Sequence, residues 1–159
     1  MCKSRSPPVK LSNKGRYAVR ALFDIAFYNE GRPTQVKDIA ERQSIPPRFL
    51  EQIFQDLKRA GIVASKRGPQ GGYSLAKPAA QIKLSEVIRA LEGPISLGEK
   101  SAEKSADQDE VRRVTESIFR DLSQRVEECF AAVSVSDICA RADELGLPRP
   151  GARRYVYVI

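Results

Sequence analysis

The stretch RFLEQIFQDLKRAGIVASKRGPQGGYSLA, residues 48–76, decides the fold. Its first part places apolar residues at helical spacing and ends at Gly61, a residue that suits the position after a helix. The apolar stripe of this helix consists of Leu50, Ile53, Phe54 and Leu57. Two short β-prone runs follow, 62–66 and 73–76, separated by the glycine-rich turn 67–72. A helix followed at once by a small hairpin indicates a helix-turn-helix with a β wing.

Two helices are expected ahead of this stretch. Ser12 is a fitting N-cap for an amphipathic helix over residues 11–29, because its hydroxyl can accept a backbone N–H of the first turn. Thr34 can cap a short second helix that ends near Gln43, and one proline of the pair 46–47 suits the first turn of the third helix. Two short helices joined by a tight turn complete a helix-turn-helix, whose second helix carries the apolar stripe described above.

Downstream of the hairpin the pattern is helical again. A short helix is expected over 84–92, and a polar connector follows over 97–106. A last short helix over 134–145 opens on a capping-box pair, Ser134 and Asp137. The stretch between the connector and this last helix differs from both short helices in its length.

A long helical pattern occupies residues 107–130, with apolar residues every three or four positions. A helix of this length spans ~35 Å at about 1.5 Å per residue, which is too long for so small a domain to bury. Pairing with the same helix of a second copy, as a homodimer, is the expected solution, and packing only on its own chain is the alternative. The expected dimerisation residues are Val111, Val114, Ile118, Leu122 and Val126.

The charge of the chain favours a polyanionic partner. It carries 27 Lys and Arg against 20 Asp and Glu, a formal net charge of +7 and a pI near 9.5. Such an excess points first to nucleic acid, although many basic proteins have no specific polyanion to bind. The chain has no histidine, which excludes Ser-His-Asp and Cys-His catalysis. Since no other nucleophile–base pair is found, an enzyme is not expected.

Nothing in the sequence indicates a membrane protein or an exported one. No apolar run of 18 residues is present, so no membrane span is predicted. The basic N-terminus is followed by no apolar segment, so no secretory signal is predicted either. A cytoplasmic protein is expected.

The second helix of the helix-turn-helix is expected to enter the major groove of double-stranded DNA. With its stripe buried, the residues that lie partly outward are Arg48, Phe49, Glu51, Gln52 and Gln55, and those near its N-terminus can contact base edges. For Phe49, packing on the first helix is an equal alternative. Arg67 leads a slim loop that can enter the minor groove, although an ordinary hairpin turn is the alternative. The predicted DNA-binding residues are Lys10, Ser12, Lys14, Arg48, Phe49, Glu51, Gln52, Lys58, Arg67 and Gly71. The basic residues expected to bind phosphates and set the register are Lys10, Lys14, Lys58, Arg59 and Lys66.

The predicted architecture is mainly α, a winged helix-turn-helix with a small β-hairpin wing and a long dimerisation helix. The sequence contains no internal repeats. Its parts are a basic N-terminal tail over 1–10, the winged helix-turn-helix DNA-binding domain over 11–96, a flexible connector over 97–106, the dimerisation helix and short C-terminal helix over 107–147, and a C-terminal tail over 148–159.

Three segments resemble the Rrf-type winged-helix regulators, the family that includes the iron–sulfur cluster regulator IscR and the cysteine metabolism repressor CymR. They are LSNKGRYAV at 11–19, FLEQI at 49–53 and RGPQGGYSL at 67–75. The resemblance extends over residues 10 to about 96, and it implies a homodimer with crossed long helices on a roughly palindromic DNA operator. The recognition positions that it implies are Arg48, Phe49, Glu51 and Gln52, with the wing arginine at Arg67.

Many members of this family hold an iron–sulfur cluster on three cysteines that follow a Glu-Gly break, often with a histidine. Here residues 92–108 contain no cysteine and the chain has no histidine, so no cluster, no other metal and no cofactor is expected. Cys129 and Cys139 are expected to face inward as small apolar side chains. Redox sensing by Cys2, Cys129 or Cys139 is the alternative input for the regulator.

Two further segments resemble the cysteine-repressor branch more than the cluster-binding branch, namely LEGPISL at 91–97 and YVYVI at 155–159. In that branch a C-terminal isoleucine docks in the active site of cysteine synthase. The resemblance implies that Tyr157, Val158 and Ile159 bind this enzyme, with the terminal carboxylate imitating that of an amino-acid substrate. A frayed tail or an edge strand is the alternative. The expected function is repression of cysteine or sulfur metabolism genes together with cysteine synthase.

Overall fold

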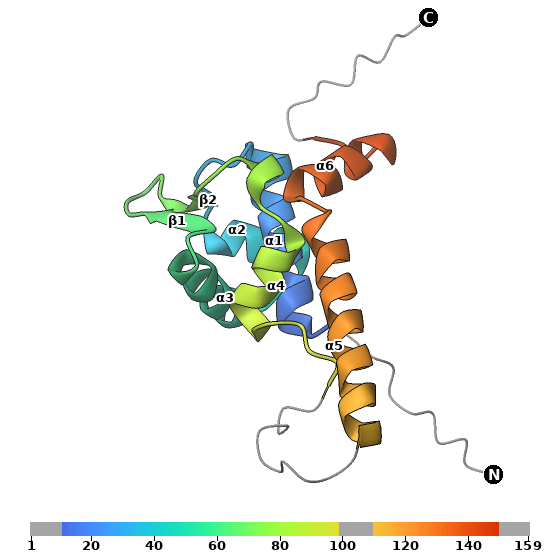
Figure 1. Ribbon diagram of the computed structural model, residues 1–159. Helices are drawn as coiled ribbons and strands as arrows, with labels where there is room; N and C mark the ends of the chain where they lie inside the picture. The colour runs from blue at the N-terminus through green and yellow to red at the C-terminus, as the bar shows by residue number, and fades with distance from the viewer. Residues whose placement is uncertain (1–10, 99–109, 150–159) are drawn as a thin grey trace, which may run out of the picture.

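The chain folds into a helical body with one small hairpin, as Figure 1 shows. The computed structural model describes residues 11–98 and 110–149. The elements in chain order are α1 (Asn13–Asn29), α2 (Val36–Gln43), α3 (Pro47–Arg59), β1 (Val63–Lys66), β2 (Gly72–Leu75), the 3-10 helix η1 (Ala79–Gln81), α4 (Leu84–Glu92), α5 (Glu110–Ala131) and α6 (Val135–Glu144). The mainly α winged helix-turn-helix predicted from the sequence is confirmed.

Local side-chain chemistry sets where two of the helices begin. The Ser12 hydroxyl accepts the N–H of Gly15 at 3.2 Å and caps α1, as predicted. At α6, Ser134 and Asp137 form the expected capping box, in which each side chain accepts the backbone N–H of the other residue. These bonds satisfy backbone donors that have no partner within the helix.

The start of α2 differs from the prediction that Thr34 caps this helix. The N-cap is Gln35, whose side chain makes no capping bond, and the Thr34 hydroxyl donates to the Arg32 carbonyl oxygen at 3.1 Å. The backbone of Thr34 pairs instead with Tyr73 of the hairpin, N–H to carbonyl in both directions at 2.9 Å. This tertiary pairing places Thr34 one residue before the cap and takes precedence over its local preference.

The core forms where α1, α2 and α3 meet the base of the hairpin. All four residues of the predicted α3 stripe are fully buried: Leu50, Ile53, Phe54 and Leu57. The Phe54 ring stacks on the Tyr73 ring, with centroids 4.4 Å apart and planes at 9°. This stacking joins α3 directly to β2.

The hairpin pairs β1 and β2 in an antiparallel register that places Lys66 opposite Gly72. Its turn is closed by the N–H of Gly71, which donates to the Gly68 carbonyl oxygen at 2.9 Å. A Cβ on Gly71 would overlap the Lys66 carbonyl oxygen, and a Cβ on Gly72 would overlap that of Thr34. Gly72 also has a φ of +138°, which side-chain-bearing residues rarely adopt. The tight turn therefore requires this glycine pair.

Helix α5 lies along one side of the body, and its N-terminal part extends beyond it in Figure 1. Arg89 of α4 forms an ion pair with Glu127 of α5, and the N–H of Leu97 donates to the Ser123 hydroxyl at 2.9 Å. These contacts fix one face of α5 to the body and leave the other face outside it. In the part of the chain that the structure describes, no helix is both long and apolar enough to cross a membrane.

Candidate nucleic-acid interface

The turn between α2 and α3 is fixed by residues of α1. The fully buried carboxylate of Asp24 accepts from the Arg42 guanidinium, at 2.6 Å for the shortest contact, and from the Gln43 amide at 2.8 Å. The hydrogen bond to Asp24 raises the pKa of Arg42, so this guanidinium keeps its charge. Arg20 adds a bond from its guanidinium to the Gln43 carbonyl oxygen. Together these contacts hold the helix-turn-helix against α1.

Helix α3 turns a polar face to solvent. The exposed residues of its first two turns include the three polar candidates Arg48, Glu51 and Gln52. Phe49 is half-buried, and its ring meets the Tyr17 ring of α1 edge-on, with centroids 5.7 Å apart and planes at 87°. The alternative of packing on the first helix is therefore the one observed for Phe49, which leaves only part of its ring to contact DNA.

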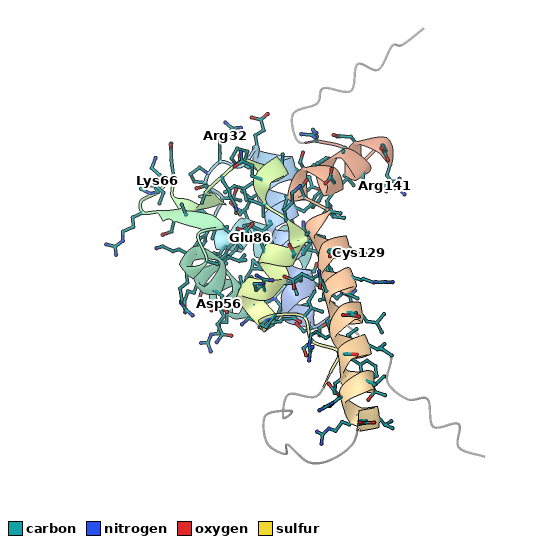
Figure 2. All side chains as sticks on the ribbon, in the orientation of Figure 1. Arg32, Asp56, Lys66, Glu86, Cys129 and Arg141 are labelled. Atoms are coloured by element: carbon teal, nitrogen blue, oxygen red, sulfur yellow. The ribbon has the colours of Figure 1, made fainter. Side chains whose placement is uncertain are left out.

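The wing projects from the side of the body that lies away from α5, next to α3 (Figure 1). Arg67 is exposed in the turn, directly after Lys66, which Figure 2 labels on the wing. Lys58 of α3 donates from Nζ to the Ser65 hydroxyl of β1 at 2.6 Å. Gly71 is buried, so it shapes the turn and presents no side chain. Helix α3, with its exposed polar residues, and the wing, with its exposed arginine, are therefore neighbouring elements, away from α5.

Two predicted DNA-binding residues at the start of α1 already have partners within the protein. Lys14 forms an ion pair with Asp56 at 2.6 Å and keeps 34% of its side chain exposed. The Ser12 hydroxyl caps α1 and also donates to the Glu92 carboxylate of α4. Lys10 lies outside the described residues.

Gln35 shapes this interface but is absent from the residues predicted to form it. Its amide nitrogen donates to the Pro69 carbonyl oxygen in the wing turn at 3.1 Å. The two residues are 34 positions apart in the chain, so no local pattern relates them. A glutamine that reaches a distant loop looks the same in sequence as one that points to solvent, and only the fold distinguishes them.

The apolar residues predicted for dimerisation lie on the open face of α5. Four of them are 66, 58, 52 and 41% exposed, in the order Val111, Val114, Ile118 and Leu122. Val126 is half-buried, and Phe119, which is not among the predicted residues, is 42% exposed. A contiguous apolar strip of this kind commonly marks a protein–protein interface.

The two described cysteines do not share the inward orientation expected of them. Cys129 is exposed (Figure 2), and the expectation that it faces inward is wrong. The reason is helical periodicity: α5 turns Ser123 to the body, and Cys129 follows Leu122 by seven positions on the open face. Cys139 is half-buried, and this burial raises the pKa of its thiol. Cys2 lies outside the described residues.

The fold and this surface define a winged-helix DNA-binding regulator. A family profile described as Rrf2, iron-dependent transcriptional regulator, matches residues 11–141. The chain belongs to the Rrf2 family, and it is a transcriptional regulator rather than an enzyme.

Relatives and solved structures agree with this assignment. An HTH-type transcriptional regulator of Azotobacter vinelandii is 37% identical over 146 residues, which cover 92% of this chain and 88% of the relative. The regulator IscR of Vibrio campbellii is 38% identical over 130 residues, which cover 82% of this chain and 77% of the relative. The structure of T. potens IscR matches with a TM-score of 0.72 at 35% identity, covering 89% of this chain and 93% of that one. CymR of B. subtilis, described as the global cysteine regulator, matches with a TM-score of 0.69 at 30% identity, covering 84% and 98%.

The family description raises the question of whether these residues could hold iron. Within residues 11–98 and 110–149, no three His, Cys, Asp or Glu side chains lie close enough together to bind a metal ion. The chain has no histidine, and its two described cysteines stand on different helices, α5 and α6. Iron–sulfur clusters are commonly held by four cysteine thiolates. The residues present do not fit such a cluster, and iron has no part in the mechanism proposed for this chain.

Proposed function

We propose that this regulator binds double-stranded DNA with α3 in the major groove and the wing in the minor groove. The observation that carries the proposal is that α3, with its exposed polar residues, lies next to the wing, in whose turn Arg67 is exposed (Figure 1). Arg48 can bond guanine, Gln52 can bond adenine and Glu51 can accept from cytosine. Phe49 keeps a smaller apolar contact, and Arg67 suits the negative potential of a narrow minor groove.

Phosphate contacts are assigned to both ends of this surface. At one end, Ser12 and Lys14 lie at the N-terminus of α1, where helix N–H groups favour anions, and Lys10 precedes them in the chain. At the other end, Lys58 lies near the wing. Contacts of this kind fix the register of the protein on DNA without reading its sequence. Each one releases a condensed counterion, so affinity should fall steeply as salt rises.

A second copy of the chain is proposed to cover the open face of α5. Ile118 and Leu122 would bury their exposed surface there, and each Å² of apolar surface removed from water stabilises the dimer by about 25 cal/mol. A two-fold dimer places two recognition helices on a roughly palindromic operator, with half-sites roughly one helical turn of DNA apart. Two copies at +7 each carry +14, which favours association with DNA.

The genes under control are proposed to be those of cysteine or sulfur metabolism, with the chain acting as a repressor. Support comes from the likeness to B. subtilis CymR, described as the global cysteine regulator, and from residues that do not fit an iron–sulfur cluster. The proposed partner is cysteine synthase, bound through Tyr157, Val158 and Ile159, which lie outside the described residues. A carboxylate beside an apolar side chain suits a pocket that is built for an amino acid.

A second candidate input is thiol oxidation, which the exposure of Cys129 favours. CymR of Staphylococcus aureus, 26% identical with a TM-score of 0.64, has been solved in an oxidized form. Oxidation of Cys129 would place a polar group at the C-terminal end of the proposed dimer face, about two helical turns beyond Leu122, and weaken association of the two copies.

A gel shift separates these inputs, with DNA from upstream of the regulator's own gene as the probe. The full chain is compared with one lacking Ile159, each with and without cysteine synthase. The synthase is expected to change the shift of the full chain and to leave that of the shortened chain unchanged. If the synthase changes neither, the partner is wrong, and an oxidant is then tested on the full chain against Cys129→Ser. If the full chain binds no DNA, the proposed interface is wrong.

A further inference from the structure

The wing is attached to the body differently at its base and at its tip. At the base, Thr34 and Tyr73 exchange backbone hydrogen bonds of 2.9 Å in both directions. At the tip, the Gly71 N–H closes the turn on the Gly68 carbonyl oxygen, which fixes the shape of the turn but not its direction. The residues of β1 beyond Val63 are exposed, so apolar packing does not hold the tip in place.

Gln35 connects the tip to the helix-turn-helix. Its Nε2 donates to the Pro69 carbonyl oxygen at 3.1 Å, and no other side chain in the described part of the chain hydrogen-bonds this turn. Gln35 is the N-cap of α2 yet makes no capping bond, so removing its amide leaves the start of the helix intact. Helix α2 itself is held to α1 by the ion pair of Arg42 with the buried Asp24. The tip is therefore bonded to a fixed point of the body.

We propose that Gln35 is a positioning residue, which prepares Arg67 for DNA by holding the wing turn in one direction relative to α3. A loop that is ordered before binding loses less conformational entropy on DNA than a loop that is ordered only there. Gln35 acts through Pro69 and does not itself touch DNA. The inference rests on the minor-groove role proposed for Arg67 and adds the residue that sets its reach.

The test is a double-mutant cycle on the full chain, measured as affinity for a duplex that the full chain selects from a random DNA library. Gln35→Met keeps the length of the side chain and removes the donor, and Arg67→Ala removes the proposed contact. Gln81→Met is the matched control, the same change at an exposed glutamine of η1. Gln35→Met is expected to weaken binding about 2- to 10-fold, the value of one hydrogen bond. In the Arg67→Ala background, Gln35→Met should leave the affinity for DNA unchanged. The thermal midpoint of Gln35→Met should equal that of Gln81→Met.

The other outcomes overturn the inference in distinguishable ways. If Arg67→Ala leaves the affinity unchanged, the proposed minor-groove contact fails and the inference fails with it. If Arg67→Ala weakens binding and Gln35→Met does not, the proposed function stands and the inference alone is wrong. An equal loss from Gln35→Met in both Arg67 backgrounds would mean that Gln35 contacts DNA directly. A lower thermal midpoint than that of Gln81→Met would assign the loss to folding.

Discussion

The DNA-binding side of the molecule and helix α5 differ in how many of their side chains find partners within a single chain. On the DNA-binding side, the contacts that set its shape lie within the chain, from the Arg42–Asp24 pair to the bond from Gln35 to the wing. On α5, Ile118 and Leu122 remain 52 and 41% exposed. Contacts within one chain complete the first region, whereas the exposed apolar face of the second is where we propose that another copy binds.

In the proposed dimer, the two regions would have separate tasks. The recognition of one half-site depends on α3 and the wing, which one chain positions by itself. The distance between two half-sites would depend on how two copies associate through α5, as proposed above. A substitution on the DNA-binding side should therefore change unfolding or specificity at any protein concentration. A substitution on the open face of α5 should change the concentration at which the protein works.

The largest expected effect is a loss of stability from a substitution in the core beneath the DNA-binding side. Phe54→Ala removes a fully buried ring that stacks on Tyr73, so the free energy of unfolding should fall by roughly 3–5 kcal/mol. Urea unfolding measures this, with Phe119→Ala on α5 as the matched control, since that ring is 42% exposed. Equal losses for the two variants, under conditions where the chain is monomeric, would show that the two regions do not differ as described.

On the incomplete side, Ile118→Glu should dissociate the dimer. A charge left unpaired in an apolar interface costs roughly 3–5 kcal/mol, so association should weaken about 100-fold or more. Sedimentation analysis measures the association, and the monomer should keep its fold because Ile118 is 52% exposed. Ser117→Glu is the control, with the same charge one position away and off the apolar strip. A dimer that survives Ile118→Glu and not Ser117→Glu would place the interface elsewhere on α5.

The features that could be predicted from the sequence depend on residues close together in the chain. The α3 stripe could be recognised because helical periodicity alone brings Leu50 and Phe54 to one face, and both are buried. The same holds for the caps at Ser12 and Ser134, where a hydroxyl acts within three residues. The long helix with its apolar strip followed from the spacing of its apolar residues.

The parts that could not be predicted depend on contacts between distant segments. Thr34 has the chemistry of a cap, but backbone pairing with Tyr73 uses it differently. From sequence alone, Cys129 is expected to be a small buried residue. It is exposed because the opposite side of α5 packs on the body. Phe49 had two equal interpretations until the position of Tyr17 settled its packing. In each case the local preference is worth about as much as one tertiary contact, so the fold decides.

A smaller effect should distinguish base contacts from phosphate contacts within the DNA-binding side. Arg48→Ala should reduce the preference for the selected duplex over unrelated DNA by about 5- to 150-fold, the value of one bidentate base contact. Arg59→Ala, at the exposed end of α3, should weaken binding to both DNAs alike and lower the salt dependence by about one counterion. Fluorescence anisotropy over a range of salt concentrations measures both variants. If Arg48→Ala weakens both DNAs equally, Arg48 contacts phosphate and the base-reading residues lie elsewhere on α3.

The smallest expected effect lies at the junction where α5 leads into α6. Hydrogen bonds from the Ser134 backbone and hydroxyl lower the pKa of Asp137 below its ordinary value of 3.8. A carboxyl with a lowered folded-state pKa stabilises the fold above its unfolded pKa, and this stabilisation is lost as pH falls through the lower folded value. Asp137→Asn should therefore reduce the drop in thermal midpoint between neutral pH and about pH 3, while Ser134→Ala should reduce it in the same way. If both variants keep the full acid dependence, other carboxyls cause it. If acid instead lowers the dimer content of the wild type and leaves its unfolding unchanged, the contacts of Ser134 with Asp137 affect association through α5 rather than the stability of the body.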